Sequence, residues 1–89
     1  MITLTHTSTT GFCDADDSEY TRSGLQESIL LHCDVEHCVL WYNNEGVDGD
    51  EVEEIINVKV RIDCMEDPAA VDYTVIAEVM LFEYEEDEQ

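Results

Sequence analysis

Two stretches of alternating hydrophobic and polar residues predict strands with one solvated face. In residues 2–8, Ile2, Leu4 and His6 alternate with threonines. The alternation is clearest over 56–64, where the hydrophobic positions are Ile56, Val58, Val60, Ile62 and Cys64 and the polar positions are Asn57, Lys59, Arg61 and Asp63. Because successive side chains of a strand point to opposite faces, each stretch can bury its hydrophobic face.

Residues 71–84, VDYTVIAEVMLFEY, predict a longer strand with hydrophobic groups on both faces. The run is rich in β-branched and aromatic residues, which lose side-chain freedom in a helix and favour strands. The preceding MEDPAA stretch is expected to form a turn. Asp67 before Pro68 leaves open a helix start at that point, but the composition of 71–84 favours a strand.

The stretch from Leu25 to Tyr42 carries mixed signals. Ser23 and Gln26 fit a capping box, and Leu25, Ile29 and Cys33 follow helical spacing, which together predict a short helix. The VLWY sequence at 39–42 favours a strand after it, with a hairpin turning at 34–37 as the alternative. NNEGVDGDE at 43–51 is rich in turn-forming residues, so the chain is expected to reverse there.

These elements predict one acidic domain over residues 1–89. The polar stretch 11–24 is a connector, and the chain has no internal repeat and no linker rich in proline and glycine. We expect a β-dominated fold, α+β or all-β, built on a single antiparallel sheet of about four strands, with or without one short helix on one face.

The net charge of the chain excludes some classes of function. The chain has 23 acidic and 3 basic residues and a formal net charge of −20, which argues against direct binding of nucleic acid. Its 44% of hydrophobic residues, arranged in patterned runs, argue against a disordered acidic tail. Neither a membrane span nor a secretory signal is recognisable, so we expect a soluble cytoplasmic protein, in the host cytoplasm if the protein is viral.

The acids concentrate in the predicted turns and at the C-terminal end. A small domain needs a net charge of only about 2 to 8 for solubility, so this excess suggests a function for the charge itself. We expect the partner-binding residues to be Asp14, Asp16, Asp17, Glu19, Glu45, Asp48, Asp50, Glu51, Glu53, Glu54, Glu83, Glu85 and Glu86.

In size and charge, the chain resembles the small acidic nucleic-acid mimics of phages and mobile elements. That class includes antirestriction proteins, the uracil-glycosylase inhibitor and several anti-CRISPR proteins, which do not share one fold. The resemblance implies a stoichiometric inhibitor that occupies the nucleic-acid groove of a basic DNA- or RNA-binding protein or host defence nuclease complex. Its aromatic anchors among the acids would come from Trp41, Tyr20, Tyr42 and Tyr84. Formation of a homodimer stays open.

Three other interpretations account for parts of the sequence. The acidity and the single lysine also suit a salt-adapted small acidic domain from a halophile, acting as a protein-interaction or zinc-stabilised module. For zinc, the repeated pairs His32-Cys33 and His37-Cys38 lack a second ordered pair downstream, and no calcium-binding loop is complete. No metal site or cofactor is therefore expected.

Catalysis is not expected either, because paired carboxylates are too common in this chain to be selective and no nucleotide-binding motif is present. The four cysteines, Cys13, Cys33, Cys38 and Cys64, are expected to be free thiols in a reducing compartment. Two disulfides in any of three pairings, or a metal-bound set, stay open as alternatives.

Overall fold

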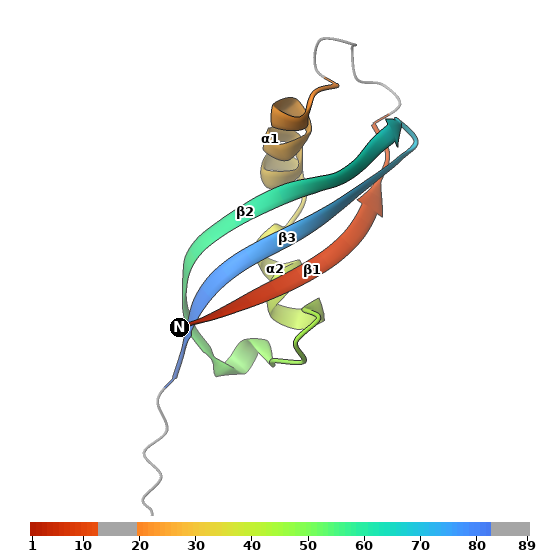
Figure 1. Ribbon diagram of the computed structural model, residues 1–89. Coiled ribbons are helices and arrows are strands. Elements are labelled where there is room, and N and C mark those ends of the chain that lie inside the picture. Colours follow the sequence, from red (N-terminus) through yellow and green to blue (C-terminus); the bar gives the residue numbers. More distant parts are fainter. Residues whose placement is uncertain (13–19, 83–89) are drawn as a thin grey trace, which may run out of the picture.

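The computed structural model describes residues 1–12 and 20–82, which form a three-stranded antiparallel sheet with two α-helices on one of its faces (Figure 1). The elements in chain order are β1 (Ile2–Thr10), α1 (Arg22–His32), α2 (Val35–Tyr42), the 3₁₀-helix η1 (Gly49–Glu51), β2 (Val52–Asp67) and β3 (Ala70–Leu81). The expected sheet-dominated α+β fold is confirmed. The described residues contain three strands rather than about four, and two α-helices rather than one.

Strand β3 lies at the centre of the sheet, in the order β1-β3-β2, and is antiparallel to both neighbours. Its central position explains its composition, because a central strand is covered on both sides by neighbouring strands and on one face by the helices. Under the helices it buries Val71, Tyr73, Val75, Ala77 and Val79. The predicted strand is therefore confirmed.

The expected turn between β2 and β3 is also present. Asp67 pairs with Ala70 across it, and the Asp67 carboxylate accepts a hydrogen bond from the backbone N–H of Ala69 at 2.9 Å. The Asp67 carboxylate thus stabilises a tight turn between two strands. The alternative prediction, a helix that begins at Pro68, is therefore wrong.

The alternation predicted for 56–64 holds at its centre and fails at its start. Val60 and Ile62 are buried, and Lys59 and Arg61 are exposed. A register shift between Ile55 and Asn57 inserts an extra residue into β2. Because of this extra residue, the side chains that precede the bulge point to the sheet face opposite to the one the alternation predicts. Ile55 therefore packs against the core, and the expectation that Ile56 is buried is wrong, since it is 48% exposed.

Strand β1 follows its predicted alternation and extends beyond it to Thr10. Leu4 is completely buried, while Thr3 and Thr7 on the other face are exposed. His6, on the face of Leu4, is half-buried, and its Nδ1 lies 3.0 Å from the backbone oxygen of Tyr42. Strand β1 thus packs one face against the helices, as expected.

Helix α1 begins two residues earlier than its predicted capping box. The N-cap is Thr21, whose hydroxyl accepts a hydrogen bond from Gly24 N–H at 3.1 Å. Ser23 lies inside the helix, so the proposed box of Ser23 and Gln26 is wrong. The helical spacing was correct, because Leu25 and Ile29 are both buried against the sheet.

Helix α2 replaces the strand predicted at 39–42, and also the alternative hairpin. Its N-cap is Asp34, whose carboxylate accepts a hydrogen bond from His37 N–H at 3.2 Å. Val35 and Val39, four residues apart, form one buried stripe, so tertiary packing outweighs the strand preference of VLWY. At the other end, the Asn43 side-chain amide donates to the oxygens of Val39 and Val47 at 2.8 Å each.

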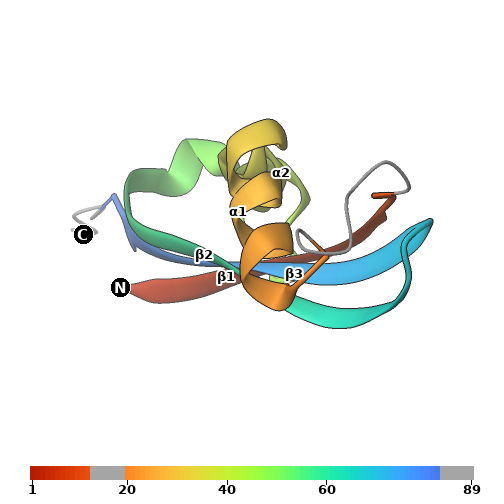
Figure 2. The ribbon, with the colours of Figure 1, turned by 90° about the horizontal axis from the view of Figure 1, so that it is seen from above.

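The molecule has two layers, and we name its two sides after them. The helices and residues 43–51 lie over one face of the sheet, here called the helix side (Figure 2). The other face has no helix over it among the described residues and is called the open sheet face. The hydrophobic core fills the space between sheet and helices. None of the helices in the described ranges is long and apolar enough to cross a membrane.

Candidate functional site

Six of the predicted partner-binding acids fall in one short stretch of the described chain, here called the acidic segment 45–54. Its members are Glu45, Asp48, Asp50, Glu51, Glu53 and Glu54. The segment runs from the end of α2 through η1 into the start of β2. The other seven predicted residues, Asp14, Asp16, Asp17, Glu19, Glu83, Glu85 and Glu86, lie outside the described residues.

The segment is held to the fold by specific contacts on either side of its turn. Asn43 brackets the turn, because its side chain donates to the Val47 oxygen at 2.8 Å and accepts from Val47 N–H at 2.9 Å. Gly46 has a φ of 76°, a conformation that favours glycine. Gly49 packs against the Trp41 indole, so closely that a β-carbon there would lie 2.7 Å from the ring. The acids are thus displayed on a defined backbone.

Glu45 has a structural role within this segment. Its two carboxylate oxygens accept hydrogen bonds from the N–H and from the hydroxyl of Thr5, each at 2.8 Å. Asn44 N–H donates to the Thr5 oxygen at 2.7 Å in the same place. These hydrogen bonds satisfy the backbone N–H and carbonyl of Thr5 at the outer edge of β1. Without them, the two groups could pair with a strand of another molecule. Glu45 is therefore less available to a partner than its sequence position suggests.

Among the remaining acids, two more support η1. The Glu51 carboxylate accepts a hydrogen bond from the backbone N–H of Asp48 at 3.3 Å. The backbone N–H of Glu51 donates to the backbone carbonyl oxygen of Asp48 at 3.0 Å. Asp50, Glu53 and Glu54 are exposed, and no side-chain hydrogen bond or ion pair within residues 1–12 and 20–82 engages them. These three carboxylates are the most available of the segment.

Sequence reasoning missed three further acids on the helix side. Glu27 lies in the middle of α1, Asp34 caps α2, and Glu36 lies in its first turn; all three are exposed. One signal was present in the sequence, because residues 23–58 contain no lysine or arginine. The acids of this stretch therefore have no basic residue nearby in the chain, whichever secondary structure it adopts.

The three basic residues lie away from the acidic segment. Lys59 and Arg61 point to the open sheet face, while Val60 and Ile62, which alternate with them along β2, point into the core. Arg22 begins α1, at the opposite end of the helix side from η1, and its guanidinium donates to the Ile62 oxygen at 2.6 Å (Figure 1). Carboxylates therefore lie on both sides, including Asp72 and Glu78 on the open sheet face, whereas Lys59 and Arg61 lie on the open sheet face alone.

A hydrogen-bonded network on the open sheet face joins all three strands. The Asp63 carboxylate accepts from the Thr74 hydroxyl at 2.6 Å and from Arg61 Nε at 2.7 Å. The hydroxyls of Thr7 and Thr74 lie 3.2 Å apart. The hydrogen bond from Thr74, supported by Arg61, lowers the pKa of Asp63 below its ordinary value. Asp63–Arg61 is the only ion pair among the described residues, and it lies outside the acidic segment.

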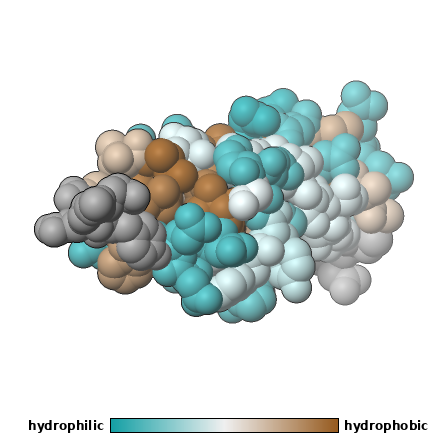
Figure 3. Space-filling view, turned by 90° about the horizontal axis from the view of Figure 1, so that it is seen from below, coloured by the Kyte–Doolittle hydropathy of each residue, from teal (hydrophilic) through white to brown (hydrophobic). Residues whose placement is uncertain are grey.

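Exposed hydrophobic side chains gather at one end of the molecule, the left-hand end of Figure 3, where β1 begins and β3 ends. We call Met1, Ile56, Met80 and Phe82 the terminal patch; they are between 38% and 73% exposed. The patch adjoins the acidic segment, because Met80 pairs with Glu54 and Phe82 N–H donates to the Glu51 oxygen at 3.0 Å. Hydrophobic and acidic surfaces therefore meet at this end.

The aromatic residues expected as anchors differ in their exposure. Trp41 and Tyr42, at the end of α2, are 47% and 63% exposed. Tyr20 instead packs against the core, and its hydroxyl donates to the Met65 oxygen. Tyr84 lies outside the described residues. Trp41 and Tyr42 thus have surface available for a partner, and Tyr20 has a structural role.

The cysteine and histidine pairs do not assemble a metal centre within the described ranges. Cys33, Cys38 and Cys64 are free, half-buried thiols, and Cys13 lies outside these ranges. No group of three or more His, Cys, Asp or Glu side chains suited to a metal ion occurs among the described residues. Burial is the main reason that the pKa of the Cys38 thiol is raised, with the neighbouring Asp34 adding to the effect.

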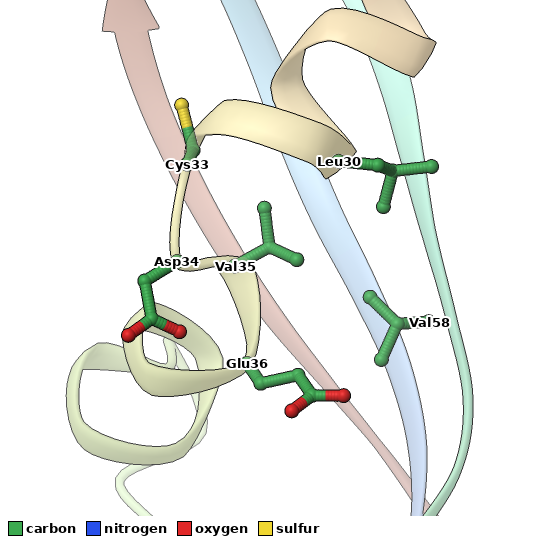
Figure 4. Close-up of a pocket in the computed structure, with 6 residues that line it drawn as sticks. All are labelled: Leu30, Cys33, Asp34, Val35, Glu36 and Val58. Carbon is green, nitrogen blue, oxygen red and sulfur yellow. The ribbon is translucent and has the colours of Figure 1, made fainter.

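A small pocket of about 270 Å³ opens on the helix side where α1 meets α2. It is lined by Leu30, Cys33, Asp34, Val35, Glu36 and Val58 (Figure 4). The volume lies below the range of about 300 to 1,000 Å³ that is typical of small-molecule sites. The pocket is thus better suited to a single side chain of a partner than to a cofactor.

Comparison with known proteins gave no match to any family model, to any curated protein or to any solved structure.

Proposed function

We propose that this protein is a non-catalytic, acidic nucleic-acid mimic. It would inhibit a basic DNA- or RNA-binding protein, such as a host defence nuclease complex, by occupying its nucleic-acid groove, in the manner of antirestriction and anti-CRISPR proteins. The proposal requires no cofactor and no direct contact with nucleic acid.

One observation carries the proposal: the exposed carboxylates of the helix side and the acidic segment 45–54 have no cationic partners in the described structure. The single ion pair there, Arg61–Asp63, lies on the open sheet face. Carboxylates without compensating cations project a strong negative potential, which attracts the lysines and arginines that line nucleic-acid grooves. Carboxylates such as Asp72 and Glu78 also lie on the open sheet face, but Lys59 and Arg61 lie there with them.

The terminal patch and the exposed aromatics supply a second type of contact. Protein interfaces gain most of their affinity from a few hydrophobic or aromatic anchors, while surrounding charges steer association. Met80 and Phe82 border the acidic segment, and Trp41 packs against Gly49 within it. A partner bound to the acids would therefore meet hydrophobic surface at the edge of the same region.

A halophilic origin is the second candidate explanation for the acidity, favoured by the single lysine. The described acids lie on both faces, but Lys59 and Arg61 lie together on the open sheet face and no described ion pair engages the acidic segment, which favours a directed interaction instead.

The test begins with capture of basic proteins from a cell lysate on the immobilised full chain at low salt. A partner is identified as a protein that is released by added DNA or RNA duplex. The triple variant Asp50→Asn, Glu53→Gln, Glu54→Gln should then weaken binding to the purified partner by about 5- to 150-fold, since each exposed pair contributes about 0.3 to 1 kcal/mol.

The control variant Glu66→Gln, Asp67→Asn, Asp72→Asn makes the same change in net charge around the β2–β3 turn, at the other end of β2 from the acidic segment. It should weaken binding less than threefold. Equal losses in both variants would show that only total charge matters and would contradict a defined mimic surface.

A further inference from the structure

The pocket between α1 and α2 is lined by three hydrophobic side chains and has one carboxylate that faces it. Val35 and Val58 face one another across the opening, Leu30 extends over β2 from the end of α1, and the Glu36 side chain extends toward Val58 (Figure 4). The Asp34 carboxylate points away and is already engaged by His37 N–H at 3.2 Å. The pocket therefore has three hydrophobic side chains in its lining and one available carboxylate at its rim.

We propose that this pocket receives an arginine side chain from the partner protein. The inference rests on the proposed function, in which the partner is basic. The aliphatic stem of the arginine would pack on Leu30, Val35 and Val58, and its guanidinium would form an ion pair with Glu36. Long basic side chains commonly bury their methylene groups in this way while the charged end stays near water.

The size and the local electrostatics both favour such an occupant. A volume of about 270 Å³ admits one long side chain without the depth that a cofactor needs. The C-terminal end of α1 and the N-terminal end of α2 both border the pocket, so their opposite partial charges offset one another. The Glu36 carboxylate therefore supplies the negative charge that stabilises a cation there.

None of the protein's own basic side chains is available for the pocket. Arg22 donates to the Ile62 oxygen, and Arg61 pairs with Asp63. Lys59 follows Val58 in β2 but points to the opposite face of the sheet. Arginine suits the site better than lysine, because its planar guanidinium binds a carboxylate through two hydrogen bonds and is more weakly hydrated than an ammonium.

The test uses the free full-length protein and N-acetyl-arginine amide as the probe, followed by nuclear magnetic resonance. Titration at low salt should give saturable shifts of the methyl groups of Leu30, Val35 and Val58. The neutral isostere N-acetyl-citrulline amide should cause at least fivefold smaller shifts at the same concentration. The lysine analogue should bind more weakly than the arginine probe.

Two charge-matched variants complete the experiment. Glu36→Gln should weaken binding of the arginine probe about fivefold, the effect of about 1 kcal/mol for one partly exposed pair. Glu27→Gln, on α1 outside the pocket, should change it less than twofold. Spectra of both variants in the absence of probe confirm that the fold is retained.

Equal effects of the two variants, equal binding of citrulline, or shifts that spread over all carboxylates without saturating would overturn the proposal. The experiment measures the pocket in the free protein, whereas nucleic-acid mimicry is measured by competition for the partner. Failure of one is therefore distinguishable from failure of the other.

Discussion

Trp41 and Gly49 are in such close contact that glycine is the only residue that fits at position 49 without movement of the ring. A β-carbon built there would lie 2.7 Å from both Cε2 and Cζ2 of the indole. The contact joins the end of α2 to η1 and so fixes the acidic segment 45–54 against the helix layer. Trp41 is also the only tryptophan, which makes its fluorescence a direct report on this contact.

The variant Gly49→Ala should displace the Trp41 ring and shift its emission to longer wavelength. Because the ring is 47% exposed and can rotate outward, we expect a loss of about 1 kcal/mol in the free energy of unfolding. Gly46→Ala is the control, since its β-carbon has no neighbour within 4 Å but its φ of 76° disfavours alanine. It should cost about 1 kcal/mol without changing the emission. An unchanged emission in Gly49→Ala would contradict the contact.

Substitutions in β2 test the facing of its side chains. Val60→Asp should unfold the domain, because it places an unpaired charge in the buried core, whereas Lys59→Ala should change stability by less than about 0.5 kcal/mol. Ile56→Asn should be tolerated similarly, because the bulge leaves Ile56 exposed. Urea denaturation followed by circular dichroism measures all three. Equal effects of Val60→Asp and Lys59→Ala would refute the assigned register.

The lowered pKa of Asp63 predicts a pH-dependent contribution to stability. Its ionised form is favoured in the folded state by the Thr74 hydroxyl and by Arg61. The contribution is therefore present above the unfolded-state pKa, about 3.9, and is lost as the pH falls through the lower folded-state pKa. At pH 7, Asp63→Asn should lower the free energy of unfolding by about 1 kcal/mol.

The difference between this variant and the wild type should disappear in acid. Glu66→Gln, which removes one negative charge from an exposed position of the same strand, is the control and should not destabilise the protein at pH 7. A constant difference between wild type and Asp63→Asn from pH 7 to pH 2 would show that the network contributes through packing and not through the charge of Asp63.

Salt should stabilise the fold, because added ions screen repulsion among 23 acids that are matched by only three bases. At physiological ionic strength the screening length is already about 8 Å, so the protein should unfold cooperatively at 0.15 M NaCl. Further salt should raise the melting temperature gradually. A chain that folds only in molar salt would instead support halophilic adaptation as the cause of the acidity. Thermal melts from 0.05 to 2 M NaCl distinguish the two.

The sheet could be predicted from sequence wherever one local pattern dominated. The alternation around Val60 and the β-branched run of β3 identified two strands, and the threonine-rich alternation around Leu4 identified the third. The strand predicted at 39–42 failed because burial of Val35 and Val39 against the sheet outweighs the local preference of Leu40, Trp41 and Tyr42. The misplacement of Ile56 has a similar cause, since a bulge depends on pairing with a strand distant in sequence.

The candidate site was predictable in composition but not in the roles of individual residues. The sequence located the acidic segment 45–54, but the structure divides its acids, because Glu45 is bonded to Thr5 at the β1 edge of the sheet and Glu54 lies in β2 at the other edge. It could not show that Glu45 is bound to Thr5, 40 residues away, nor that the first turn of α2 displays Glu36 at a pocket. Both facts depend on how α2 docks against β1 and β3 and α1 against β2, which local patterns do not encode.

Direct competition with nucleic acid tests the central proposal most sharply. A labelled DNA or RNA duplex is first bound to the purified partner, and the full-length protein is then titrated in while fluorescence anisotropy and complex mass are measured. A mimic should release the nucleic acid stoichiometrically, one chain for each occupied groove, and added salt should weaken its binding. A stable ternary complex of partner, nucleic acid and this protein in the same groove would contradict the mechanism, however tightly the protein binds.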